Sequence, residues 1–341
     1  MAIPAVDVIG TAIEHAKQQL FKPFRLGQWT RLAVVGLLAG ESVGGCSLSY
    51  NFPFTPRNGG SQSFMLQAAL ARGPLFVAAI AFLILVGLAL AVLLVYVNSM
   101  MRFVLFDSVI ARECHIRRFW RQRTEPGLLY FVWQLVLGMI SLAGVAILVL
   151  LAAGVAFGFG WLRNPRDHIL PLILCGLVFL AALAVWFFVF ILVHVLTKDF
   201  VVPQMALDHV GPVEGWRRLF AMMDSEKARF AGYLGWKILL RIGASILTAL
   251  AGILAALIIL LPVGIPALIV FLAARAAGIT WNILTLTIAF TAGLGTLAAI
   301  LYAFLLILAP CTVFFPAYSI YFFAARYQSL NAVLTRGNPA G

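Results

Sequence analysis

The run ILPLILCGLVFLAALAVWFFVFILVHVLTKD (residues 169–199) contains no Asp, Glu, Lys or Arg until its closing lysine–aspartate pair. A helix of about 20 apolar residues is long enough to cross the ~30 Å hydrocarbon core of a bilayer. Lipid offers no hydrogen bonds to an unpaired backbone, and the run lacks the alternation of a strand. The run therefore predicts a membrane-spanning helix.

The composition of the whole chain agrees with this prediction. The 341 residues are 63% hydrophobic and only 11% charged, with a mean hydropathy of +1.03, whereas soluble domains are about 25% charged. We expect an all-α integral membrane protein that forms a single polytopic domain over residues 1–341. It would have a cytoplasmic amphipathic segment (1–28), six transmembrane helices within 29–322 and a cytoplasmic tail (323–341). The expected spans are 29–48, 74–105, 127–158, 169–197, 229–262 and 280–322.

The division between the last two spans is open. The stretch LPVGIPALIVFLAARAAG (261–278) contains two prolines, and proline interrupts the hydrogen bonding of a helix. The sequence is compatible with a short extra helix, a re-entrant segment or a simple connection.

The basic residues indicate an orientation. Most of the 24 Lys and Arg residues fall in the N-terminal segment, after the second span, between the fourth and fifth spans, and after the last span. By the positive-inside rule these segments face the cytoplasm. We therefore expect a multi-pass protein of a bacterial inner membrane with both termini cytoplasmic. Anionic lipid headgroups then balance the net charge of +12, and nucleic acid is not expected as a partner.

Three segments at the ends of long spans look alike. They are SMMRFVLFDSVI (99–110), TKDFVVPQMALD (197–208) and PCTVFFPAYSI (310–320), in which Pro203 and Pro316 occupy equivalent positions. Stretches with helical amphipathic spacing follow the first two. The pattern predicts three parallel helical-hairpin repeats, with interfacial amphipathic helices between them, around an axis along the membrane normal.

Ionisable residues within a span are costly, and Glu41 and His194 are the two singled out here. Glu41 stands beside Gly36, Gly40 and Gly44, whose spacing allows another helix to approach closely. It is interpreted either as a proton or cation site or as a residue at a helix end wetted by the outer loop. His194 either titrates or binds a ligand, or it simply hydrogen-bonds a neighbour. Glu41 and His194 are the candidate intramembrane polar site.

A second candidate is a cluster of charges near the cytoplasmic ends of spans four and five. Lys198 and Asp199 are adjacent, and Lys237 and Arg241 share one face of a helix because they are four residues apart. This cluster would hold a lipid headgroup, pair internally, or anchor the helices in the interface.

Pro203 and Pro316 are candidate hinges. Each removes a backbone donor and disfavours helix at the preceding residue. The alternative interpretation places the ends of helices at these two prolines.

Motifs for catalysis are absent from the sequence. It contains no phosphate-binding loop, HExxH, CxxC or GxSxG motif. The four cysteines, Cys46, Cys114, Cys175 and Cys311, lack the spacing of a metal site or a disulfide framework. The sequence predicts no enzyme, no metal and no cofactor.

The plan of the chain resembles a group of prokaryotic membrane proteins that are similar to the membrane domain attached to some glycerophosphodiester phosphodiesterases. The resemblance rests on LFKPFRLGQWTRLAVVGLLAG (20–40), the Gly/Ser/Pro loop after it, and DFVVPQMALDHVGPVEGWRRL (199–219). It implies six helical spans in a bacterial cytoplasmic membrane. It implies no reaction, and no hydrolase domain is expected within residues 1–341.

Three functions follow as hypotheses, of which the third, an intramembrane enzyme, would need carboxylates or histidines that converge at one depth. The first is a membrane scaffold or accessory protein that acts on lipid organisation or on a protein partner, including a second copy of the chain. The alternative is a transporter or channel for a small solute or lipid, with Glu41 in the pathway. Anionic lipids on the cytoplasmic side are the expected small-molecule partners.

Overall fold

A computed structural model describes residues 4–22, 24–41, 74–161, 168–276 and 282–336. Within these residues the chain is helical, and its one β-type feature is an isolated bridge between Phe21 and Phe24. The elements are α1 (Asp7–Phe21), α2 (Leu26–Leu38), α4 (Pro74–Ala111), α5 (Ile116–Gln122), α6 (Thr124–Gly158), α7 (Ile169–Leu196), a π-helical turn η1 (Thr197–Val201), α8 (Val202–Asp208), α9 (Pro212–Ser225), α10 (Lys227–Ala276), α11 (Ile283–Ala324) and α12 (Gln328–Arg336).

Five of the six expected spans are present as helices long and apolar enough to cross a membrane. They are Val77–Ala111, Thr124–Gly158, Ile169–Asp208, Lys227–Ala276 and Thr285–Ala324. The first expected span, 29–48, is not confirmed, because α2 ends at Leu38 and residues 42–48 lie outside the described part of the chain. The chain is thus a helical membrane protein.

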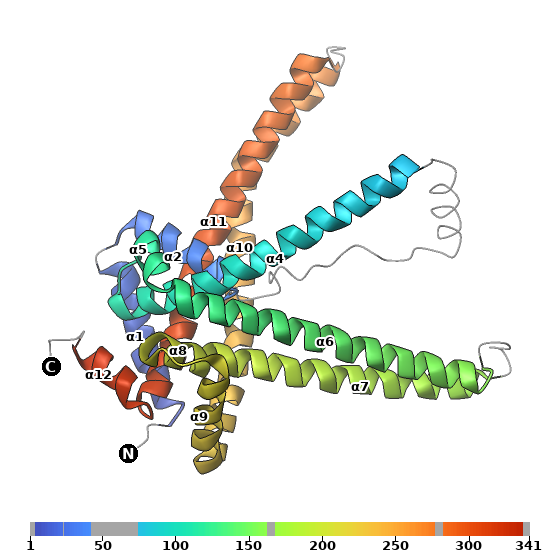
Figure 1. Cartoon of the computed structure of the whole chain (residues 1–341). Helices are drawn as coiled ribbons and strands as arrows, with labels where there is room; N and C mark the ends of the chain where they lie inside the picture. Colours follow the sequence, from blue (N-terminus) through green and yellow to red (C-terminus); the bar gives the residue numbers. More distant parts are fainter. Residues whose placement is uncertain (1–3, 23, 42–73, 162–167, 277–281, 337–341) are drawn as a thin grey trace.

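The helices form a hub from which three arms extend (Figure 1). The hub consists of η1, the adjoining ends of the long helices, and the short helices α1, α2, α5, α8, α9 and α12. The arms are the remaining lengths of α4, of the α6–α7 pair and of the α10–α11 pair. Large apolar side chains along all three arms are exposed, among them Leu83, Leu142 and Leu247. Such surfaces are stable in lipid, so the hub holds the core.

The three similar segments converge in the hub. Phe103, Phe200 and Val313 are fully buried and belong to one apolar core. Phe200 contacts aromatic rings of α10 and α11, including Tyr233 and Phe322, with ring centroids 5.2 and 6.0 Å away. The segments therefore pack together at the root of the three arms, while the internal repeat itself stays a prediction.

The segment 261–278 continues the preceding helix. Helix α10 runs without interruption to Ala276 with Pro262 and Pro266 inside it, and residues 277–278 are outside the described part. All three interpretations of this segment were therefore wrong. Apolar residues surround both prolines, and membrane helices tolerate proline where local adjustments satisfy the backbone.

The interpretation of Pro203 and Pro316 as helix ends is also wrong. Pro316 lies inside α11, and Pro203 lies in the first turn of α8, which follows η1 directly. The wider π-helical turn gives the proline ring room against the preceding turn. The helix ends instead at His209, which has a left-handed φ of 55°.

Of the three spaced glycines Gly36, Gly40 and Gly44, Gly36 shows the predicted close approach of another helix. A Cβ atom there would lie 2.3 Å from the Cβ of Thr312, so the α2 backbone packs directly against α11. Gly44 lies outside the described residues.

Candidate functional site

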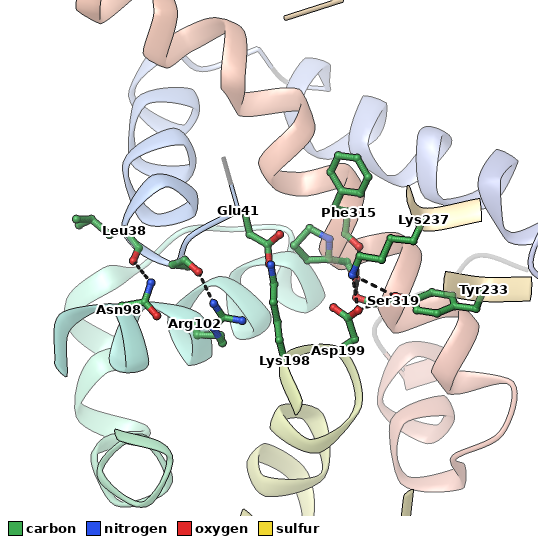
Figure 2. A network of polar contacts seen from close by, with 12 residues as sticks. Leu38, Glu41, Asn98, Arg102, Lys198, Asp199, Tyr233, Lys237, Phe315 and Ser319 are labelled. Carbon is green, nitrogen blue, oxygen red and sulfur yellow. Dashed lines mark hydrogen bonds and ion pairs between the residues drawn. The ribbon is translucent and has the colours of Figure 1, made fainter. Parts of the chain in front are cut away.

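Four segments that are far apart in the sequence bring their polar side chains together in the hub (Figure 2). Glu41 follows α2, Asn98 and Arg102 come from α4, Lys198 and Asp199 come from η1, and Tyr233 and Lys237 come from α10. Successive residues of a helix point in different directions. Lys198 and its neighbour Asp199 therefore reach different partners.

A glycine turn places Glu41. Gly40 has a φ of +72°, and the amides of Gly40 and Glu41 donate to the carbonyls of Leu37 (3.1 Å) and Gly36 (2.8 Å). This is the Schellman pattern, which ends a helix with a glycine in the left-handed region. The turn directs the carboxylate of Glu41 back into the hub, so α2 stops there instead of continuing to residue 48.

Glu41 forms a salt bridge with Lys198, and both side chains are buried, with 3% and 8% exposed. The interpretation of Glu41 as a wetted helix end is therefore wrong. The Oε2 atom of Glu41 has no hydrogen-bond partner among the residues that the structure describes. Buried charges are stable in a protein when they are paired, so each of these two residues depends on the other.

Asp199 makes the second buried pair with Lys237. Tyr233 donates a hydrogen bond to Asp199 Oδ2 over 3.0 Å, and Lys237 Nζ lies 3.3 Å from the Tyr233 hydroxyl. The three residues are at most 4% exposed. This pair joins the end of the α6–α7 arm to the beginning of the α10–α11 arm.

Asn98 and Arg102 cap the C-terminal end of α2. The Asn98 amide donates to the Leu38 carbonyl and Arg102 Nη2 donates to the Ala39 carbonyl, each over 2.7 Å. These are carbonyls that a helix end leaves without an intrahelical donor. Arg102 was not among the predicted site residues, although its four-residue spacing from Asn98 places both side chains on one face of α4.

A cavity of about 670 Å³ adjoins this network, at the point where the arms leave the hub. Residues of α2, α4, α6, α7 and α10 line it. The polar lining residues are Asn98, Arg102, Gln134, Ser141, His194 and Arg241. His194 thus faces this cavity, while the salt bridge of Glu41 is made with Lys198.

The predicted charge cluster divides in two. Lys198, Asp199 and Lys237 form the buried pairs, whereas Arg241 lines the cavity and lies 5.6 Å from the centre of the Phe315 ring. No group of His, Cys, Asp and Glu that would hold a metal ion occurs within the described ranges. Cys114, Cys175 and Cys311 are free thiols, and Cys46 falls outside those ranges.

Polar contacts also fasten the short hub helices. Arg123 binds both carboxylate oxygens of Asp107 over 2.7 and 2.9 Å. Arg326 donates to Glu226 over 2.8 Å, and this hydrogen bond lowers the pKa of Glu226. Burial, followed by the hydrogen bond to Asp208, raises the pKa of Tyr327 to about 12.

Comparison with known proteins gives one family and no activity. No curated protein and no solved structure matches the chain. Residues 3–333 match the model of a family described as a family of unknown function, DUF7544. Nothing in these comparisons links the chain to phosphodiesterase membrane domains, so that resemblance stays a prediction. Since the match covers nearly the whole chain, hub and arms together, the protein belongs to the DUF7544 family.

Proposed function

We propose that the protein is a membrane scaffold in which the hub holds three lipid-exposed arms in a fixed relation. The observation that carries this proposal is the pairing of Glu41 with Lys198. Glu41 is the residue expected in a transport pathway, and its side chain is only 3% exposed. A carboxylate that is buried and paired between α2 and η1 supports a structural role.

The second buried pair supports the same function. Asp199 and Lys237 join two arms, and Glu41 and Lys198 join α2 to one of them. Removing one partner of a buried pair leaves an uncompensated charge, which costs about 3–5 kcal/mol. The pairs therefore act as cross-links between helices that share few apolar contacts beyond the hub.

The alternative is a transporter or channel with Glu41 in its pathway. One observation favours it: Glu41 Oε2 has no partner among the described residues and so has free capacity to accept a hydrogen bond. In this alternative, the Glu41–Lys198 pair would open during transport, and water would reach it from both sides.

A flux measurement separates the two functions. The full chain is reconstituted into liposomes, and the permeabilities to protons, potassium and small anions are compared with those of protein-free liposomes. The scaffold proposal predicts no added permeability at any pH between 5 and 8. A flux that Glu41→Gln abolishes would overturn it and support the transporter.

A further inference from the structure

The cavity at the root of the arms contains donors that have no hydrogen-bond partner among the described residues. Arg102 is only 5% exposed, yet its Nε and Nη1 atoms have no hydrogen-bond partner among the described residues. The Nε2 atom of Gln134 is likewise buried and without a partner there, while its Oε1 accepts from Ser99 over 2.9 Å. Leaving a buried donor unpaired costs free energy, and the cost is larger for a charged group. Both side chains line the cavity, which indicates that something accepts their hydrogen bonds.

The charge of the lining selects an anion. Arg102 and Arg241 contribute guanidinium groups, and no carboxylate is among the described residues that line the cavity. Glu41 lies close by, but its charge is balanced by Lys198, as that of Asp199 is by Lys237. Arg102 forms no salt bridge with any residue in the described ranges. A guanidinium group binds phosphate oxygens in a bidentate fork, which makes phosphate a well-matched anion.

The rest of the lining is apolar. Leu94, Leu137, Phe187, Phe190 and Ile191 form much of the wall towards the arms. The volume of about 670 Å³ is within the usual range of small-molecule sites. A free inorganic anion would leave this apolar wall uncovered, whereas a phospholipid presents a charged headgroup and an acyl chain together.

The depth of the cavity matches the headgroup region. From the start of the apolar span at Val77 to Arg102, helix α4 rises about 38 Å, and α7 rises about the same distance from Ile169 to His194. The hydrocarbon core of a bilayer is only ~30 Å thick. If the two helices cross the bilayer with little tilt, Arg102 and His194 lie near the level of the headgroups on the hub side of the membrane.

We propose that this cavity binds the phosphate headgroup of an anionic phospholipid, with Arg102 as the main contact and the acyl chains between the arms. The inference goes beyond the scaffold function and does not depend on it. The flux measurement tests the scaffold function and the lipid titration below tests the cavity. Failure of one proposal can therefore be told from failure of the other.

The first test uses native mass spectrometry on the purified full chain. The protein is titrated with dioleoylphosphatidylglycerol and, separately, with dioleoylphosphatidylcholine, which has the same acyl chains and no net charge. The proposal predicts that Arg102→Gln weakens phosphatidylglycerol binding about tenfold, the effect of losing one charge-assisted hydrogen bond. Phosphatidylcholine has the same phosphate group, but its quaternary ammonium group is disfavoured by the cationic lining, so it should bind weakly to both proteins.

The control is Arg118→Gln, which removes an arginine of the basic cluster on the hub surface. That cluster also contains Arg31, His115, Arg117 and Arg121. If Arg118→Gln weakens phosphatidylglycerol binding as much as Arg102→Gln, or if Arg102→Gln leaves it unchanged, the lipid binds to the surface and the proposal is wrong.

A second pair of variants leaves every hub contact in place. Gly138 lines the cavity, and a Cβ atom there would meet no heavy atom within 4 Å, so the side chain of Gly138→Leu can start without a clash and occupy cavity volume. Gly154 is equally open on the same helix and does not line the cavity. Gly138→Leu should weaken phosphatidylglycerol binding severalfold, and Gly154→Leu should not. Equal binding by the two variants would overturn the proposal even if Arg102→Gln fails to fold.

A competition experiment identifies the source of the phosphate. Glycerol 3-phosphate, which has the headgroup chemistry but no acyl chain, is added at millimolar concentration. It should not displace phosphatidylglycerol. Displacement that Arg102→Gln abolishes would show a site for a free phosphate anion and would contradict the lipid proposal.

Discussion

Single buried polar residues hold the hub together, and His15 shows how pH acts on them. His15 is 4% exposed and bonds the Val109 carbonyl over 2.9 Å and the Tyr321 hydroxyl over 3.0 Å. It thereby connects α1 to α4 and α11. Burial lowers the pKa of His15 below its ordinary value of 6.5, Arg112 lowers it further, and the bond to Val109 opposes both.

The folded protein should therefore lose stability in mild acid. Below a pH of about 6.5 the unfolded chain binds a proton at His15, whereas the folded chain still holds His15 neutral. The contribution of His15 to the free energy of unfolding is therefore complete above that pH and is lost as the pH falls below it. Between pH 7.5 and 5.5 the thermal midpoint in detergent should fall by roughly 2 °C more for the native chain than for His15→Gln. Equal falls in the two proteins would show that His15 is not buried in its neutral form.

The Asp199–Lys237 pair gives a second prediction at this scale. Lys237→Met should destabilise the protein by about 3–5 kcal/mol, because it leaves Asp199 buried without its cation. The double variant Asp199→Leu/Lys237→Met removes both charges and should recover most of that loss. Unfolding midpoints of Lys237→Met, of Asp199→Leu and of the double variant measure the difference. A double variant as unstable as the sum of both single variants would mean that the residues do not interact.

Helix packing in the hub depends on close backbone contacts, which the glycine spacing in α2 predicted. Gly36→Ala should force α2 away from α11, because the Cβ of Thr312 is part of a rigid stem and cannot rotate aside. We expect a loss of about 1–3 kcal/mol, as for other overpacked interiors. Gly27→Ala in the same helix meets no atom within 4 Å and is the matched control. Its midpoint should stay the same or rise, and a similar loss in both variants would contradict the contact.

Elements were predicted well where local composition decides them. The apolar runs specify α4, α6, α7, α10 and α11 because burial in lipid depends on hydrophobicity alone. The predictions that failed at prolines have a common cause. Whether Pro262 and Pro203 end a helix depends on what surrounds the backbone, and a π-helical turn such as η1 leaves no signal in the apolar pattern.

At the scale of the whole molecule, the sequence identified the charged residues of the site but not their partners. Lys237 and Asp199 had been considered together, whereas Glu41 had been assigned to the outer side and Lys198 to the inner side. Their contact depends on the Gly40 turn, which ends α2 early and returns Glu41 to the hub. The donors of Arg102 were missed because only the packed structure shows which of them lack a partner.

The central claim is that the hub is sealed around Glu41. The most direct test places a cysteine at that position by Glu41→Cys in a chain whose four native cysteines are alanine, with Lys198→Met to avoid an unpaired charge. Vesicles of each orientation are treated with a membrane-impermeant maleimide. The account predicts no labelling from either side and full labelling after denaturation. Labelling of the folded protein from both sides would reveal an aqueous pathway and contradict the account.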